Sequence, residues 1–287
     1  MLILLPASKA MIGTRCLQWI DETGAKCCVD SHRGQVMGCI LKQGGGLYSR
    51  MRVGAVLLAA GQGSRLGNQP KALLQLQGVP LINRHLIALS GAGVDEVVVV
   101  TGFYHDRIEA AVQTFPVQVV RNEDPAAGQA SSVRLGVEAV GERFDAVIMM
   151  LCDQPLVNAA DITALIAAFK KRPYGEIVMP EVNGQRGNPI VLSGKAMSEI
   201  LAGGQNMYCR KYMDAHPELI SHYKTDNEHF IADVDTEEDL AAFEKKWGFE
   251  LTLPDTGQCA TDGDESSPNG SDEPAYIALR KRFAVSQ

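Results

Sequence analysis

The chain has 287 residues, of which 46% are hydrophobic and 21% are charged, as in an ordinary globular protein. The formal net charge of -7 excludes a general attraction to nucleic acid, and no apolar run approaches the ~20 residues that span a bilayer. We therefore expect neither nucleic acid nor a membrane as a partner. The seven cysteines are scattered, and the opening MLILLPASKA lacks the charge and length of a secretion signal, so we expect a cytoplasmic protein.

Residues 1–50 differ in character from the rest of the chain. Short β-like runs at 16–20, 26–29 and 35–41 predict a small hairpin, and the three glycines at 44–46 predict a linker. We expect residues 1–50 to form an N-terminal extension with little order. The alternative is that translation begins at Met51, directly before the first strongly apolar strand.

Residues 51–250 alternate between strand-like apolar runs and segments with helical periodicity. This alternation predicts an α/β fold, with three α/β/α layers around a mostly parallel, Rossmann-like sheet. The expected strands are 53–59, 96–101, 117–120, 145–151 and 219–223, and the expected helices are 79–89, 106–112, 129–140, 158–170, 193–201, 207–215 and 236–247. Apolar runs at 177–179 and 189–192, joined by a polar loop, predict a small β-hairpin substrate subdomain. Asn158 and Thr236 have the residue types of helix N-caps.

Two features are expected to carry no chemistry. Residues 251–287 are rich in Pro, Gly, Ser and acidic residues, a composition that cannot bury enough apolar surface to become ordered. We expect an acidic, disordered tail there. His85 lies among Leu and Ile on a predicted helix, and we interpret it as half-buried packing and not as a ligand.

The stretch from residue 53 to residue 71, VGAVLLAAGQGSRLGNQPK, runs from a predicted buried strand into a glycine-rich loop. Gly61, Gly63 and Gly67 allow the backbone to approach a ligand closely, and converging N–H groups in such a loop bind anions. Arg65 and Lys71 add positive charge, so the loop predicts a polyphosphate site. It matches neither the dinucleotide fingerprint, which needs a glycine three residues after Gly63, nor the P-loop, whose lysine directly follows a glycine.

Carboxylates at two further places are candidate ligands of Mg²⁺. Asp153 directly follows a strongly apolar predicted strand, and parallel strands of such a sheet place their carboxyl ends at one edge. Asp233 and Asp235 share one side of the chain if that segment is extended, so either could reach the same ion. The alternatives without a metal are that Asp153 is a turn residue and that Asp233 and Asp235 are solvated charges at the start of a helix.

The loop resembles the signature L-A-A-G-x-x-x-R-x-G-x-x-K of the MobA-like NTP transferase family, with one extra residue before Lys71. Asp-Gln-Pro at 153–155 and the run DVDTEEDL at 233–240 resemble two further motifs of that family. The resemblance implies that Asp153 and Asp235 hold the catalytic Mg²⁺, with Asp233 as the reserve candidate. It covers residues 53 to about 247.

Two segments resemble the molybdenum cofactor cytidylyltransferase branch of the family: GQASSVR at 128–134 and GNPI at 187–190. Ala60 also fits that branch, whereas Gln129 stands where Met is usual. The resemblance implies nucleotide contacts from Leu58, Ala59, Ala60, Gly61, Gly63, Ser64, Arg65, Lys71, Gln129, Ser131 and Ser132. It implies acceptor contacts from Arg186, Gly187, Asn188 and Pro189.

The function implied is transfer of a nucleoside monophosphate, with CMP favoured, from an NTP to a phosphate acceptor, for which molybdopterin is favoured. Pyrophosphate leaves, and the catalytic residues are Arg65, Lys71 and Asp153. The expected partners are these small molecules, with a transient contact to a molybdoenzyme maturation protein. The alternatives are a guanylyl or sugar-phosphate nucleotidyltransferase, a nicotinamide-dependent oxidoreductase and a non-catalytic nucleotide-binding module.

Overall fold

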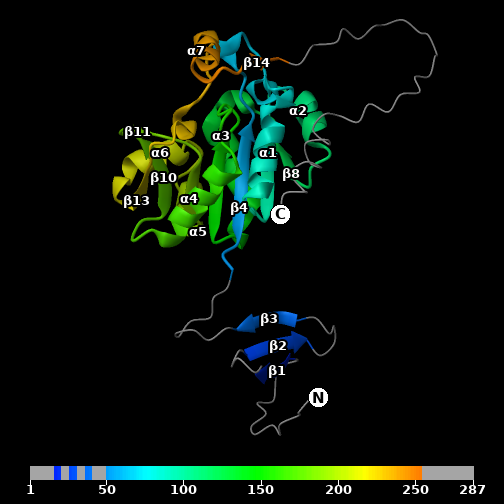
Figure 1. Cartoon of the computed structure of the whole chain (residues 1–287), viewed down its shortest axis with the longest axis vertical. Helices are drawn as coiled ribbons and strands as arrows, with labels where there is room; N and C mark the ends of the chain where they lie inside the picture. Colours follow the sequence, from blue (N-terminus) through cyan, green and yellow to red (C-terminus); the bar gives the residue numbers. More distant parts are fainter. Residues whose placement is uncertain (1–15, 21–25, 31–35, 41–49, 254–287) are drawn as a thin grey trace, which may run out of the picture. The chain divides into compact units, whose positions relative to one another are not determined.

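A computed structural model describes residues 16–20, 26–30, 36–40 and 50–253. The predictions of little order at 1–50 and of a disordered tail at 251–287 fall mostly on residues outside these ranges. The chain divides into two units, Met1–Arg50 and Met51–Gln287 (Figure 1). In the first unit, the three β-like runs form an antiparallel sheet in the order β1-β2-β3, with the bounds β1 (Cys16–Ile20), β2 (Lys26–Asp30) and β3 (Val36–Ile40).

The second unit is built on an eight-stranded sheet in the order β11-β10-β12-β9-β4-β7-β8, with β13 paired to β10. Its four expected apolar strands are parallel, with β4 in contact with both β9 and β7, so the mostly parallel α/β prediction is confirmed. The bounds are β4 (Val53–Ala59), β7 (Glu96–Thr101), β8 (Gln118–Arg121), β9 (Ala146–Leu151), β10 (Ile177–Val182), β11 (Gln185–Arg186), β12 (Ile190–Ser193) and β13 (Ile220–Lys224).

Helices cover both faces of this sheet because the side chains of β4 alternate between two apolar cores. Ala55 and Leu57 pack in one core with α1, α2 and α4, while Val56 and Leu58 pack in the other with α3, α5 and α6. The bounds are α1 (Leu81–Gly91), α2 (His105–Val112), α3 (Gln129–Val140), α4 (Ala159–Lys171), α5 (Gly194–Ala202), α6 (Cys209–Ala215) and α7 (Glu237–Trp247). None of the helices in the described ranges is long and apolar enough to cross a membrane.

The predicted hairpin is continuous with the main sheet. β10 turns through Asn183 and Gly184, both with positive φ, into β11, and the chain returns as β12 between β10 and β9. Both predicted N-caps are confirmed: Asn158 accepts the N–H of Ala160 (2.9 Å), and Thr236 accepts the N–H of Asp239 (3.1 Å). Short 3₁₀ helices complete the unit: η1 (Ser64–Leu66), η2 (Lys71–Leu73), η3 (Pro125–Ala127), η4 (Gly141–Arg143), η5 (Pro217–Leu219) and η6 (Glu228–Ile231).

Three expectations differ from the structure. The helix expected from residue 79 begins at Leu81, because β6 (Val79–Pro80) pairs with β5 (Gln75–Leu76) in a second sheet. The folded unit extends past residue 250, because β14 (Leu251–Thr252) pairs with β5. His85 is fully buried, and not half-buried, because α1 is covered by α4 as well as by the sheet.

Candidate functional site

The glycine-rich loop leaves the carboxyl end of β4, the central strand of the parallel part of the sheet. Its 3₁₀ turn η1 is flanked by Gly63 and Gly67, which have φ of 65° and 61° and so adopt the left-handed region that favours glycine. A Cβ on Gly63 would lie 2.0 Å from the carbonyl oxygen of Gln69, so no other residue fits there without moving the backbone. The loop is therefore folded tightly on itself.

Tyr104, at the start of α2, fixes this loop from outside. Its hydroxyl donates to the carbonyl of Gln62 (2.9 Å) and also contacts the carbonyl of Asn68. Because these carbonyls lie on the two sides of η1, one side chain holds both ends of the turn. Tyr104 thus restrains the loop backbone, which lowers the cost of ordering it on binding.

A cavity of about 360 Å³ opens beside the loop, at the carboxyl ends of β4 and β9. It brings together ten of the eleven predicted nucleotide contacts and the predicted catalytic carboxylate: Leu58, Ala59, Ala60, Gly61, Gly63, Ser64, Arg65, Lys71, Gln129, Ser132 and Asp153. Ser131 does not line it; its hydroxyl donates to the carbonyl of Gly128 and accepts from the amide of Asn122, each at 2.8 Å. Ser131 therefore shapes the start of α3.

Asp235 forms ion pairs with both predicted cations of the loop. Its Oδ2 lies 2.7 Å from Arg65 Nη2, and its Oδ1 contacts Lys71 Nζ. The residue is positioned by the start of α7, where the carboxylate of Asp239 accepts the N–H groups of Asp235 (3.0 Å) and Thr236 (2.8 Å). The capping box of α7 therefore places a carboxylate against the phosphate-binding loop.

Asp153 lies beside this charged group. Its backbone carbonyl accepts the N–H of Val234 (2.9 Å), which ties the end of β9 to the segment that carries Asp235. Burial raises the pKa of Asp153 to about 6, opposed by Lys71 and reinforced by Asp235 and Asp233. Its Oδ1 is buried and has no hydrogen-bond partner within the described residues. The carboxylate thus lacks the compensation that a buried charge requires.

These features fit a divalent cation. Asp153 has an uncompensated buried oxygen, and Asp235 and Asp233 act electrostatically on it. Within the described residues no three His, Cys, Asp or Glu side chains form a cluster that could hold a metal, so this unit would supply one or two ligands. Magnesium is commonly bound in this way, with substrate phosphates and water completing its shell.

A second pocket of about 420 Å³ is lined by Gln154, Gln185, Arg186, Asn188, Arg210, Phe230, Ile231 and Asp233. It adjoins the first cavity through consecutive residues, because Asp153 lines one and Gln154 lines the other. Asp233 lines the second pocket, whereas Asp235 lines neither. Asp153 therefore stands at the boundary between the two pockets.

Two of the four predicted acceptor residues, Arg186 and Asn188, line this second pocket, whereas Gly187 and Pro189 do not. Gly187 has a packing role, since a Cβ there would lie 2.7 Å from the carbonyl oxygen of Phe230. That carbonyl accepts the N–H of Asn188 and the side-chain amide of Gln154, both at 2.9 Å. It thus connects the hairpin to the residue after Asp153.

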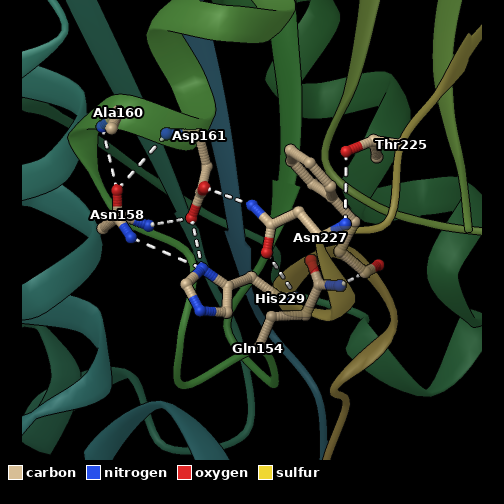
Figure 2. A network of polar contacts seen from close by, with 8 residues as sticks. Gln154, Asn158, Ala160, Asp161, Thr225, Asn227 and His229 are labelled. Atoms are coloured by element: carbon tan, nitrogen blue, oxygen red, sulfur yellow. Dashed lines mark hydrogen bonds and ion pairs between the residues drawn. The ribbon is translucent and has the colours of Figure 1, made fainter.

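A buried polar network holds the segment that carries this carbonyl (Figure 2). Asp161, in the first turn of α4, is 6% exposed, and its carboxylate accepts from Asn227 Nδ2 (2.6 Å) and from the backbone N–H of Asn158 (3.0 Å). His229 Nδ1 lies 2.9 Å from the same carboxylate. Asn227 and His229 flank the start of η6, so α4 determines where Phe230 lies.

Sequence reasoning missed several lining residues. Phe103 and Ile108 line the first cavity, and Phe103 is 39% exposed although it is a large apolar residue. An aromatic residue just after a strand's carboxyl end is a signal that could have found it. Arg210, on α6, lines the second pocket, but nothing in its local sequence distinguishes it from its neighbour Lys211.

A parallel sheet with a glycine-rich, cationic loop after its central strand and a carboxylate after the adjacent strand defines the class of nucleotidyltransferase-like α/β proteins. The sequence profile of the MobA-like NTP transferase domain matches residues 55–219. The chain belongs to this family, as the resemblance of its motifs predicted.

The relatives include proteins of different named activities. Nicotine blue oxidoreductase of Paenarthrobacter nicotinovorans is 29% identical over 196 residues, which are 66% of this chain and 94% of that protein. The bifunctional protein GlmU of Gluconobacter oxydans is 36% identical over 124 residues, 43% of this chain and only 27% of GlmU.

Solved structures share the fold. A nucleotidyl transferase from Methanothermobacter thermautotroptrophicus is 25% identical with a TM-score of 0.57, over 69% of this chain and 98% of that one. The manganese complex of Rv0371C from Mycobacterium tuberculosis H37Rv is 22% identical with a TM-score of 0.55, over 68% of this chain and 98% of that one.

Proposed function

We propose that this protein transfers CMP from CTP to a phosphate acceptor, with molybdopterin as the favoured acceptor, and releases pyrophosphate. The observation that supports the proposal is the pair of adjacent pockets with Asp153 at their boundary. A group transfer needs a donor and an acceptor held side by side, with the reacting atoms between them. The preference for CTP and molybdopterin rests on the motif resemblance at 128–134 and 187–190.

The loop cations would bind the triphosphate in place of Asp235. The two oxygens of Asp235 pair with the donor groups of Arg65 and Lys71. Phosphate oxygens are acceptors of the same kind, so Arg65 and the loop N–H groups would take the β- and γ-phosphates and Lys71 the α-phosphate. Asp235 would then be free, with Asp153, to hold Mg²⁺. The ion would supply charge neutralisation at the α-phosphate.

The transfer itself needs no covalent enzyme intermediate. An oxygen of the acceptor phosphate attacks the α-phosphorus, a new P–O bond forms, and the bond to the α–β bridging oxygen breaks with its electron pair leaving on pyrophosphate. The acceptor phosphate is already ionised near neutral pH, so no general base has to remove a proton. The protein's contribution is positioning and electrostatic stabilisation.

A ligand panel followed by a turnover assay tests this proposal. Thermal unfolding is measured with CTP, GTP, ATP, UTP and NADPH, each with and without Mg²⁺, and pyrophosphate release is then measured with molybdopterin. We expect CTP with Mg²⁺ to stabilise the protein by about 2.7 kcal/mol at a hundred times its Kd, and pyrophosphate to appear only with both substrates.

Each other outcome favours one alternative. Stabilisation by GTP or UTP with turnover favours the guanylyl or sugar-phosphate transferase, and nucleotide binding without turnover favours the non-catalytic module. Stabilisation by NADPH alone favours the oxidoreductase, an activity named for one relative. The contact with a maturation protein stays a prediction, which co-purification of the two proteins would test.

A further inference from the structure

The second pocket contains two guanidinium groups from different elements, Arg186 from β11 and Arg210 from α6. Arg186 Nη1 forms an ion pair with Asp214, one turn after Arg210 on the same helix. For Arg210, no ion pair or hydrogen bond of the side chain is found among residues 50–253. The pocket therefore has one cation that is already compensated and one that is not.

The other lining groups suit an oxyanion ligand. Gln185 and Asn188 supply side-chain amides, and Phe230 and Ile231 supply apolar surface. The lining carboxylate, Asp233, acts electrostatically on Asp153, so its charge would be offset when a divalent cation binds there. A guanidinium group is planar and binds two oxygens of a phosphate at once in a fixed fork geometry, which a lysine ammonium lacks.

We propose that Arg210 anchors the phosphate of the acceptor, and that Arg186 joins it when the acceptor displaces Asp214. The inference rests on the proposed function and names the acceptor class of that site, a small phosphate monoester. The anchored phosphate is the one whose oxygen attacks the nucleotide, so Arg210 is a positioning group for the nucleophile. Asp214 acts as the internal substitute for the acceptor's oxygens, as Asp235 does for those of the nucleotide.

The binding test uses inorganic phosphate as the probe. Phosphate is titrated calorimetrically into the full chain with Mg²⁺ and saturating α,β-methylene-CTP, which occupies the loop and cannot be cleaved there. We expect Arg210→Gln to weaken phosphate binding by about 10- to 100-fold, the effect of losing a charge-assisted hydrogen bond. Lys211→Gln is the matched control, because it removes one positive charge from the adjacent, exposed position of α6.

Asp214→Asn should tighten phosphate binding, because Arg186 loses its partner and one negative charge leaves the pocket. The comparison of Arg210→Gln with Lys211→Gln separates a pocket contact from a general charge effect, which would leave these two variants equal. In turnover assays, Arg210→Gln should raise the KM for the acceptor at least tenfold and leave the KM for CTP within twofold.

Two results overturn the inference: phosphate affinity within twofold of wild type in Arg210→Gln, or an equal loss in Lys211→Gln. The proposed function fails separately, if the wild-type protein releases no pyrophosphate from CTP and molybdopterin. The phosphate titration compares variants without turnover. A loss of phosphate binding confined to Arg210→Gln would therefore still assign an anion site to this pocket.

Discussion

Replacing Asp161 by alanine should destabilise the second unit more than any surface substitution. The carboxylate is 6% exposed and is in hydrogen-bond contact with the amide of Asn227, the backbone N–H of Asn158 and the ring of His229 (Figure 2). The carboxylate is buried but its three partners are only partly buried, so each lost hydrogen bond costs about 1 kcal/mol and we expect a total loss of about 3 kcal/mol. For a unit of this size, the midpoint temperature should fall by about 6–12 °C.

Urea-induced unfolding of the full chain measures this loss. Circular dichroism reports global unfolding. In a Trp19→Phe background, the fluorescence of the remaining Trp247, whose ring centroid lies 6.0 Å from that of His229, reports the local environment. Asp226→Ala is the control, an exposed carboxylate beside Asn227 that should cost less than about 0.5 kcal/mol. Asp161→Asn keeps an acceptor oxygen and should recover part of the stability. A loss below 1 kcal/mol in Asp161→Ala would refute the reasoning.

Three further predictions concern the cavity and the core. Asp153→Asn should lower transfer at least ~10²-fold without lowering the midpoint of unfolding, because it removes a buried charge that lacks compensation. Normal turnover at limiting Mg²⁺ would contradict its role as a metal ligand. Arg65→Ala should weaken nucleotide binding as well as turnover, whereas Lys71→Ala should lower kcat more than it raises the KM for CTP. Both variants are compared by steady-state kinetics with CTP varied at saturating acceptor. An effect of Lys71→Ala on the KM alone would disprove these separate roles of the two cations. Burial lowers the pKa of His85 from its ordinary value of 6.5 to about 3. Between these two pH values the unfolded chain binds a proton at His85 that the folded protein does not bind. The free energy of unfolding should therefore fall by up to ~1.4 kcal/mol per pH unit as the pH drops from 6.5 toward 3. His85→Leu should flatten this slope in urea titrations between pH 7 and 4.5, and an unchanged slope would assign it to other groups.

The parts of the site that follow local rules could be predicted from the sequence. The glycine loop follows a buried strand, and Gly63 adopts a backbone conformation that favours glycine. Asp153 follows a strand of the same parallel sheet, and fold topology alone places both at one edge. The position of Asp235 follows from the capping signal of α7, which is also local.

The parts that depend on side-chain direction could not be predicted. Tyr104 and Asp161 make their hydrogen bonds to elements distant in sequence, and Arg210 lines a pocket with such elements. Only packing decides which way these side chains point. The full burial of His85 has the same origin, since periodicity gives the face of a helix but not how many elements cover it. Ser131 illustrates the converse, because its motif suggested a ligand contact whereas its hydroxyl is bonded within the protein.

The pairing of Arg65 with Asp235 spans 170 residues of chain, which has a consequence for biosynthesis. The ribosome makes the phosphate-binding loop early and its carboxylate partner near the end of the domain. At ~5–20 residues per second, about 10–30 s separate the two. During that interval, the nascent loop presents two uncompensated cations and no second carboxylate to share a metal. The proposed metal–nucleotide complex therefore cannot assist folding by binding tightly until α7 has been synthesised.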